Sequence, residues 1–402
     1  WLLWTLNLMD EVLRMERMKV LILTGSYGGG HEQAALALEK AFALNAAHCQ
    51  AEVLDITTLV PSKLDSFEKK TFLSGVTHFP MLYHFLYKKT QNNNAASSML
   101  KKLTRIGITR LISVVENTHP DLIISTFPPA AIMISRMKQA GYFRTLPSLT
   151  VITDYSVHST WINRFTDGYL VATEDVRQRL IDMKVEPNRI FVTGIPIRPE
   201  FSLKAKNTVL RKQYNIPARQ KVVLVMGGGC GIFSHFFNFF KELESQPIQN
   251  IRFVVICGHN QKAFNEFKTL SEQVSFPIQV LGFVTEMAEW MAMADLLVTK
   301  PGGLTISEAI ASELPMLIYR PLGGQEMDNS HYLLATGVAA AAFNPSELMA
   351  DLLNLLHHSD AIDIMRTNLK ALSTCQQNSA EQAVRKSLQF LPEHVLGDME
   401  FA

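Results

Sequence analysis

The chain has 402 residues, and its 38 Lys and Arg against 37 Asp and Glu leave a formal net charge of +1. Hydrophobic residues make up 47% and charged residues 19%, which excludes a disordered chain, because such chains are poorer in apolar residues and richer in charge. The balance of charge argues against a protein built mainly to coat nucleic acid, so we expect no nucleic-acid partner. Four scattered cysteines without a Cys-x-x-Cys pair indicate neither a disulfide framework nor a zinc site.

The first 17 residues differ from the rest of the chain. The run 1–9 is apolar but shorter than a membrane span, and Asp10 and Glu11 follow it without a small-residue cleavage site. We therefore expect 1–17 to be an extension ahead of the first strand rather than a signal peptide or an anchor. No other stretch approaches about 18 uninterrupted apolar residues, so we expect no transmembrane helix.

Short apolar runs then alternate with helical patterns. An Ala/Leu-rich helix is predicted over 32–46, and the apolar runs are nearly continuous rather than alternating, which is typical of parallel strands covered on both faces. The strands predicted in this part of the chain are 19–24, 51–55, 121–126, 149–153, 168–172 and 190–193. The pattern indicates an open α/β sheet.

The alternation of apolar runs and helical patterns begins again after a proline-flanked polar stretch, which we interpret as a linker near 197–215. The strands predicted beyond it are 221–226, 252–257, 278–281, 295–299 and 316–319. The sequence thus predicts an α/β protein of two Rossmann-like domains with parallel sheets facing a central cleft. We place the domains at 18–200 and 201–375 and expect a C-terminal helix within 376–402 to pack back on the first.

The segment 63–110 breaks this pattern with nine basic and two acidic side chains and six interleaved aromatic residues. One interpretation is a set of helices with solvated basic faces. The other is an interfacial surface, where Lys and Arg meet anionic headgroups and aromatic rings enter the boundary. The sequence leaves both open.

The first glycine-rich loop, GSYGGGH at 25–31, lies between the first strand and its helix. Its spacing fits neither the dinucleotide fingerprint nor the P-loop, where Lys would replace His31. It is either a tight turn with a capping histidine or an anion or sugar site, because glycines admit a ligand to backbone N–H groups at a helix start. In the second case Gly28, Gly29 and Gly30 line the site and His31 is a candidate base.

Two more glycine-rich loops follow strands of the second domain. The loop GGGCG at 227–231 offers the same backbone chemistry, and KPGGLTISEA at 300–309 contains Gly302, Gly303, Thr305 and Glu308. Thr305 and Glu308 have capping-box spacing, so Glu308 is either a helix cap or an acceptor of hydrogen bonds from a ribose diol.

Polar side chains gather in two further loops. The loop 321–329 carries Gln325, Glu326 and Asn329, which suit sugar hydroxyls, although a surface loop has a similar composition. After the predicted strand 149–153 come Asp154 and His158, which either perform acid–base chemistry or orient each other structurally.

Taken together and in this order, these motifs resemble the GT-B glycosyltransferases of the branch that holds monogalactosyldiacylglycerol synthases and bacterial processive diacylglycerol glucosyltransferases, in glycosyltransferase family 28. The resemblance spans about residues 18–338 and is densest at 25–35, 153–161, 172–201 and 282–329. A more distant relative is the enzyme that adds N-acetylglucosamine to a lipid-linked cell-wall precursor.

The resemblance implies a UDP-sugar donor bound by the second domain, a lipid acceptor such as diacylglycerol bound by the first, and inverting transfer without a metal or other cofactor. The implied roles are Gly228, Gly229 and Gly231 at the diphosphate, Phe283 and Val284 presenting backbone to the base, Gly303 and Thr305 near the phosphates, Glu308 on the ribose, Gln325, Glu326 and Asn329 on the donor sugar, and His31 or Asp154 as the base. Free thiols in a chain of this length are typical of the reducing cytosol, and the basic segment 63–110 is one candidate for contact with anionic lipid, so we expect a cytoplasmic enzyme that is peripheral on the inner face of the membrane.

Two alternatives keep the fold and change the reaction or the acceptor. One is N-acetylglucosaminyl transfer to a polyprenyl-linked cell-wall precursor. The other is a soluble UDP-sugar 2-epimerase, which needs no basic aromatic insert. A nucleotide-sugar-binding protein without catalysis is a third possibility, but the presence of His31 and Asp154 beside the donor loops argues against it.

Overall fold

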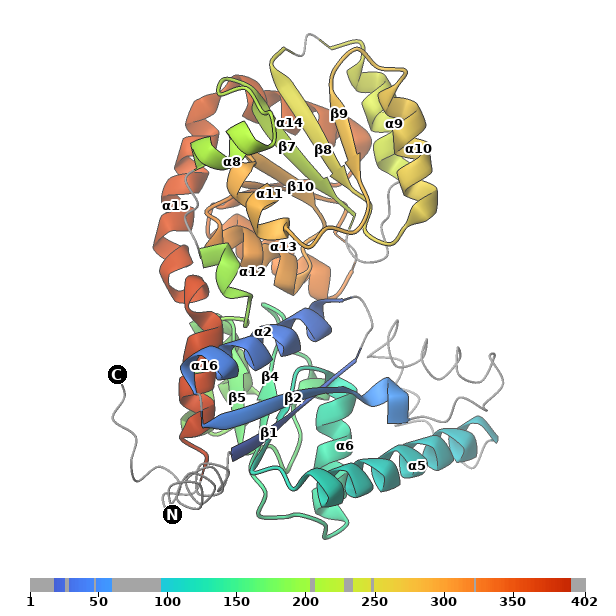
Figure 1. Cartoon of the computed structure of the whole chain (residues 1–402), viewed down its shortest axis with the longest axis vertical. Helices are drawn as coiled ribbons and strands as arrows, with labels where there is room; N and C mark the ends of the chain where they lie inside the picture. The colour runs from blue at the N-terminus through green and yellow to red at the C-terminus, as the bar shows by residue number, and fades with distance from the viewer. Residues whose placement is uncertain are drawn as a thin grey trace, which may run out of the picture.

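The computed structural model describes residues 18–25, 29–46, 48–59, 95–202, 207–227, 234–246, 249–321 and 323–391, with backbone alone at 95–106, 207, 234, 235 and 359. Two α/β units are stacked along the long axis of the molecule, the first below and the second above in Figure 1. The predicted extension 1–17 and the segment 63–94 lie outside the described residues.

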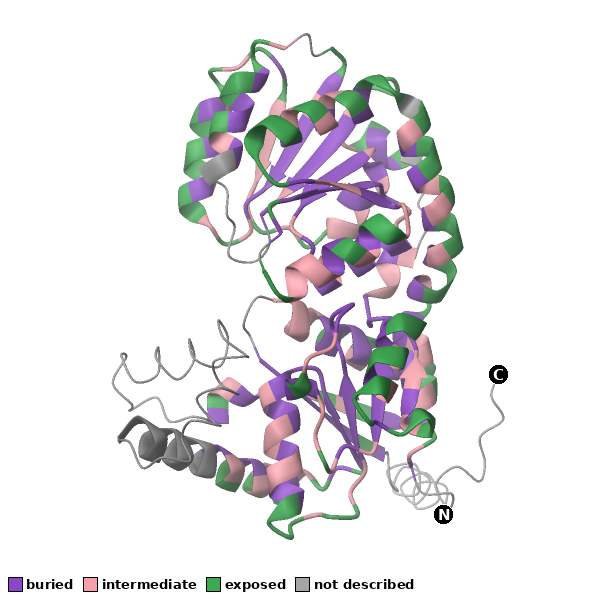
Figure 2. Cartoon of the chain, turned by 180° about the vertical axis from the view of Figure 1, so that it is seen from behind, coloured by how far each residue is buried: buried purple, intermediate pink, exposed green. Residues whose placement is uncertain are grey.

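The first unit is built on a six-stranded sheet whose strand order is β2-β1-β3-β4-β5-β6, with every neighbouring pair parallel. Its strands are β1 (Met18–Thr24), β2 (Cys49–Asp55), β3 (Leu122–Ser125), β4 (Ser148–Val151), β5 (Gly168–Val171) and β6 (Ile190–Val192). Its helices are α2 (Gly30–Asn45), α5 (Ala95–Thr118), α6 (Pro128–Gln139) and α7 (Glu174–Asp182), with 3₁₀ turns η1 (Ile56–Leu59), η2 (Ser159–Trp161) and η3 (Pro187–Arg189). The inner strands of this sheet are purple in Figure 2 because apolar side chains are buried on both faces, whereas the edge strand β2 is only partly buried.

The second unit repeats the plan with strand order β12-β11-β10-β7-β8-β9, again all parallel. Its strands are β7 (Lys221–Met226), β8 (Ile251–Ile256), β9 (Ile278–Leu281), β10 (Leu296–Thr299), β11 (Met316–Tyr319) and β12 (Ala339–Ala342). Its helices are α8 (Asn207–Gln213), α9 (Ser234–Leu243), α10 (Gln261–Ser271), α11 (Met287–Met293), α12 (Gly303–Ala311), α13 (Gln325–Ala335), α14 (Pro345–His357) and α15 (Ser359–Gln377). The predicted α/β class with two parallel sheets is therefore confirmed.

Two parts of the chain differ from the sequence-based prediction. The strand β12 is missing from it, because four alanines lack the β-branched and aromatic side chains by which strands are recognised. The stretch predicted as a linker contains η4 (Pro199–Ser202) and α8, which packs against α11. Leu210 and Arg211 of α8 are buried, so this part of the stretch belongs to the fold of the second unit.

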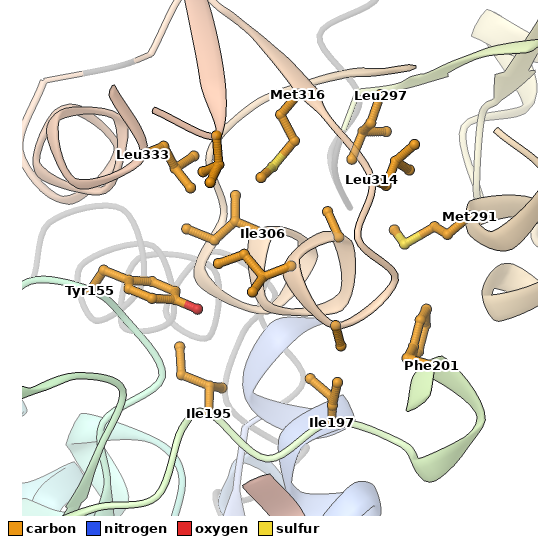
Figure 3. Close-up of a cluster of buried hydrophobic side chains, with 14 of the residues drawn as sticks. Tyr155, Ile195, Ile197, Phe201, Met291, Leu297, Ile306, Leu314, Met316 and Leu333 are labelled. Atoms are coloured by element: carbon orange, nitrogen blue, oxygen red, sulfur yellow. The ribbon is translucent and has the colours of Figure 1, made fainter. Parts of the chain in front are cut away.

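One hydrophobic cluster joins the two units. Ile195, Ile197 and Phe201 of the connecting segment and Tyr155 of the first unit are buried together with Ile306 and other side chains of the second (Figure 3). The last helix, α16 (Ser379–Leu388), returns to the first unit and packs against α2 (Figure 1). The two sheets are therefore held in one arrangement by shared apolar packing as well as by the chain that crosses between them.

Candidate active site

The site lies where the strand order reverses in both sheets. The chain runs from β1 outward to β2 and then crosses to β3, and likewise from β7 to β8 and β9 before it crosses to β10. Ligands of open α/β sheets bind in the crevice at such switch points, beyond the carboxyl ends of the strands. The two crevices face each other, because a Cβ on Gly30 after β1 would lie 3.7 Å from Cβ of Leu304 after β10.

His31 is held at the first switch point by the strand next to its own. The helix α2 begins at Gly30 after the left-handed Gly29, which makes no side-chain cap bond, so the prediction of a capping histidine is wrong. Instead, Nδ1 of His31 lies 2.8 Å from the carbonyl oxygen of Thr126, directly after β3, and 2.9 Å from Oγ1 of Thr153, after β4. The imidazole, carried by α2, is thus fixed by the segments that follow β3 and β4.

These contacts decide the tautomer of His31. A carbonyl oxygen only accepts hydrogen bonds, so Nδ1 of His31 carries the proton and Nε2 keeps its lone pair. Burial lowers the pKa of His31 to about 4, opposed by the hydrogen bond to Thr126 and aided by the nearby His158. The imidazole is therefore neutral near pH 7, with one nitrogen left to accept a proton.

Asp154 and His158 meet a side chain of the second unit. Nε2 of Gln325, the first residue of α13, lies 2.8 Å from Oδ2 of Asp154 and 2.8 Å from Nε2 of His158. An amide nitrogen has two hydrogens, so it donates one to each partner, and His158 must accept at Nε2. Its Nδ1 then donates to Oγ1 of Thr160. The interpretation that Asp154 and His158 orient each other directly is replaced by a bridge through Gln325.

Burial sets the charge of these groups. It raises the pKa of Asp154, which is 9% exposed, to about 6, while a hydrogen bond with Asn329 acts in the opposite direction. Burial also lowers the pKa of His158 to about 4. Near neutral pH the site therefore contains an ionised but easily protonated carboxylate and two neutral imidazoles.

At the second switch point the start of α12 is pressed against the first unit. Gly302 is the exposed N-cap of α12 and makes no side-chain cap bond, and Gly303 is the first helical residue. A Cβ on Gly303 would lie 2.0 Å from the carbonyl oxygen of Thr153, so only glycine fits there. Thr305 follows in the first turn, half-buried.

Glu308 is not a helix cap. It is the sixth residue of α12, well past the first turn, so the capping-box interpretation is wrong. The side chain is 8% exposed, and no group among the described residues donates a hydrogen bond to its carboxylate. Burial raises the pKa of Glu308 to about 8, partly offset by the charge of Arg198. A buried carboxyl group with a displaced pKa beside a crevice is typical of a ligand site.

Glu326 and Asn329, which are also predicted to hold the donor sugar, both have protein partners in the structure. Glu326 lies 3.6 Å from Nζ of Lys300, the residue after β10. Asn329 is 1% exposed, and both ends of its amide contact protein: Oδ1 accepts from the backbone N–H of Tyr155, and Nδ2 donates to the carbonyl of Pro301. In this arrangement Asn329 joins the two units, and its predicted contact with a sugar stays a prediction.

The loop after β9 has the two residues predicted to contact the base. Phe283 is 60% exposed and stacks on His259, with ring centroids 4.5 Å apart and an interplanar angle of 11°. Val284 packs partly against the cluster between the units. Nη1 of Arg198 donates to the carbonyl of Thr285 at 3.3 Å, so the connecting segment holds this loop.

Four predicted residues, Gly28, Gly228, Gly229 and Gly231, lie outside the described residues. Conversely, the structure adds Thr126, Tyr155 and Arg198, which the sequence motifs do not single out. Thr126 acts through a backbone carbonyl, which any residue supplies, so no sequence signal marks it. Arg198 lies in a charged, proline-flanked segment with the composition of a linker, and Tyr155 stands directly beside Asp154 in the same loop.

Comparison with known proteins agrees with this geometry. The sequence matches the family model for monogalactosyldiacylglycerol (MGDG) synthase over residues 31–197 and that for the glycosyltransferase family 28 C-terminal domain over residues 222–386. It is 31% identical over 368 residues to the processive diacylglycerol beta-glucosyltransferase of Bacillus subtilis, covering 90% of this chain and 93% of the relative. The chain belongs to this family of glycosyltransferases. The predicted resemblance is confirmed.

Solved structures with low sequence identity share the fold. A UDP-GlcNAc 2-epimerase from Neisseria meningitidis bound to UDP-GlcNAc is 15% identical with a TM-score of 0.58, covering 92% of this chain and 100% of that one. MurG from Acinetobacter baumannii is 16% identical with a TM-score of 0.56, covering 92% of this chain and 99% of that one. At such identity these likenesses establish architecture alone, so they do not favour the epimerase or cell-wall alternatives over the family shown by sequence.

Among the described helices, none combines the length and apolar character that crossing a bilayer requires. Of the basic segment 63–110, the structure describes side chains from 107 onward. One of its nine cations, Arg110, donates to the carbonyl of Leu59 at 3.1 Å.

Proposed function

We propose that this protein transfers a hexose from a UDP-sugar to diacylglycerol, with inversion at the anomeric carbon, at an anionic membrane surface. The observation that carries the proposal is the match over nine-tenths of the chain to a diacylglycerol glucosyltransferase. The geometry supports it, because candidate acid–base groups of one unit lie directly against the helix starts of the other.

The donor occupies the second switch point in this proposal. The ribose hydroxyls donate to Glu308, whose buried carboxylate lacks a donor among the described residues. The diphosphate lies at the start of α12, where unpaired N–H groups and the helix dipole stabilise negative charge without a metal. Preorganised donors of this kind stabilise the charge that develops on a leaving group.

The acceptor oxygen attacks the anomeric carbon as the bond to the diphosphate breaks, and UDP leaves with the bonding electron pair. The acceptor's proton passes to a base. Of the two candidates Asp154 is the stronger, because its pKa of about 6 lies nearer to neutrality than the value of about 4 for His31. We therefore assign the base to Asp154, and assign to Nε2 of His31 a hydrogen bond from the acceptor.

The membrane contact rests on the segment 63–110, with nine basic and two acidic residues in a chain whose net charge is +1. Nine minus two leaves +7 on this segment, so the rest of the chain carries about −6. Such asymmetry orients a protein against anionic lipid, and each basic residue near the surface contributes about 1 kcal/mol. The acceptor supports a membrane location, because diacylglycerol does not leave the bilayer freely, and we place the protein at the inner face of the cell membrane.

The reaction is tested by incubating the purified protein with UDP-glucose or UDP-galactose and vesicles that contain diacylglycerol. We expect glycolipid and UDP to form in equal amounts. Isomerisation of the sugar without any lipid product would instead establish an epimerase, and UDP binding without turnover would establish a binding protein.

The membrane contact is tested by sedimentation with anionic vesicles. Changing Lys88, Lys89, Lys101 and Lys102 to Glu should abolish co-sedimentation and leave UDP binding intact, and high salt should release the parent protein. The matched control changes the same charge on exposed lysines of the second unit: Lys212, Lys241, Lys262 and Lys268 to Glu. Equal loss in both variants would show that net charge, rather than the segment 63–110, governs binding.

A further inference from the structure

Tyr155 crosses from one unit into the other. It follows β4 in the first unit, is buried, and stacks on Tyr332 of α13 with ring centroids 4.6 Å apart and an interplanar angle of 26°. In Figure 3 its ring points toward the helix that carries Ile306, and its hydroxyl oxygen lies 2.9 Å from Oγ of Ser307. The ring therefore fills a slot formed by α12 and α13.

The direction of the hydroxyl contact follows from its neighbours. Oγ of Ser307 lies 2.8 Å from the carbonyl oxygen of Gly303, which can only accept, so the single hydroxyl hydrogen of Ser307 is donated there. Tyr155 must then donate its own hydrogen to Oγ of Ser307. A chain of two hydrogen bonds thus runs from Tyr155 to Gly303, at the start of α12.

The backbone around Tyr155 is fixed to the same place. Its N–H donates to Oδ1 of Asn329 at 3.0 Å, and Nδ2 of Asn329 donates at 2.9 Å to the carbonyl of Pro301, just ahead of α12. The carbonyl of Thr153 abuts Gly303. Residues 153–155 therefore meet the start of α12 in three ways, with Asp154 in the middle: Thr153 packs on Gly303, Asn329 links Tyr155 to Pro301, and Ser307 links it to Gly303.

We propose that Tyr155 is a positioning residue, which fixes the loop carrying Asp154 against α12 and so sets where the base lies relative to the donor's anomeric carbon. The inference rests on the proposed function, in which α12 holds the diphosphate. The apolar ring packs the two units together, and the hydroxyl fixes their relative position. A buried hydroxyl that loses its hydrogen bond destabilises the protein, so the arrangement that keeps this bond is favoured.

Replacing Tyr155 by Phe keeps the ring and removes the hydroxyl. We expect kcat to fall about tenfold, because a small misplacement of a catalytic group slows the chemical step. The Kd for UDP should stay within about twofold. Ser307→Ala should have the same effect. Because both substitutions break one chain of contacts, the double variant should be no slower than either single variant. Tyr332→Phe is the matched control: its hydroxyl makes no hydrogen bond to the described residues, so kcat should stay within about twofold of the parent.

Each outcome of this experiment has a definite meaning. A Tyr155→Phe protein that melts earlier but keeps the parent kcat, or that loses UDP affinity in parallel with kcat, overturns the positioning role. Additive losses in the double variant also overturn it, because they would show that Tyr155 and Ser307 act separately. A parent chain that transfers no sugar overturns the proposed function itself, which is a separate result.

Discussion

The two switch points differ in how their polar groups are satisfied. In the first unit the groups that would handle the acceptor already have protein partners: His31 bonds to Thr126 and Thr153, and Asp154 to Gln325. In the second unit Glu308 is buried without a donor in the described part of the chain, beside a helix start made of glycines. One side is organised by contacts within the protein, and in our proposal the other is completed by the donor.

This contrast separates chemistry from binding. Groups that transfer protons need fixed tautomers and fixed geometry, which protein hydrogen bonds provide in advance. A carboxylate that accepts from a ligand must keep its lone pairs free, so its burial is unfavourable until the ligand arrives. Substitutions on the first side should therefore change turnover, and those on the second should change affinity.

The largest effect is expected at Asp154. Asp154→Asn keeps the size and removes the base, so turnover should fall by ~10²–10⁴-fold with UDP affinity nearly unchanged. In the parent, kcat/KM should fall as the pH drops through about 6, because the base must be ionised and burial raises its pKa to about 6. If kcat/KM instead falls only near pH 4, His31 is the base.

His31→Ala removes the nitrogen that we assign to the acceptor. We expect turnover to fall by ~10²-fold, measured at saturating UDP-sugar, with little change in UDP binding. His48→Ala, on an exposed histidine just beyond the same helix, is the control and should retain full activity. Equal activity in the His31 variant would contradict the assignment.

Glu308→Gln tests the binding side. Loss of the ionised acceptor should weaken UDP binding at least about tenfold by calorimetry, because ribose hydroxyls are left with a weaker partner. Since burial raises the pKa of Glu308 to about 8, UDP affinity of the parent should increase as the pH rises from 6 to 8. The pH dependence of UDP affinity in the Gln variant shows the contribution of the nucleotide's own titration. If the parent has the same pH dependence as the variant, Glu308 does not belong to the site.

The smallest expected effect is on the stability of the protein without ligand. Here Glu308→Gln should be favourable, whereas it is unfavourable for UDP binding. The pKa of Glu308 is raised in the folded protein, so folding is favoured by the protonated form and stability is lost as the pH rises toward about 8. Without ligand, Glu308→Gln should therefore raise the melting temperature at pH 9 by a few degrees and change it little at pH 5. Saturating UDP should reverse the order at pH 9.

Local sequence patterns predict most of the fold. Apolar runs mark eleven of the twelve strands in the described part of the chain, and the signal is strongest in the inner strands, which are buried on both faces. The poly-alanine strand β12 gives none, and its place is set by pairing with β11. The segment containing α8 has the pattern of a linker because its helix is short and polar apart from Val209, which is exposed, and Leu210.

The site is predicted less completely because its partners are distant in sequence. Gln325 is assigned to the sugar from its own loop, yet its bonds to Asp154 and His158 span 171 and 167 positions. The slot for Tyr155 likewise exists only when α12 and α13 are in place. Residue type and strand ends indicate which side chains reach a crevice, but not which of them bond to one another across it.

The return of α16 to the first unit affects how the protein is made. The core under β1 contains Met18, Val20 and Phe42 from the start of the chain and Ala383 and Leu388 from its end. A ribosome that has synthesised the whole first sheet has not yet delivered the helix that covers one of its faces. On that face, the core of the amino-terminal half is therefore completed only after the whole second unit has been synthesised. By contrast, the core on the opposite face of the first sheet, within 21–146, and one core of the second unit, within 223–365, each form from side chains of a single unit.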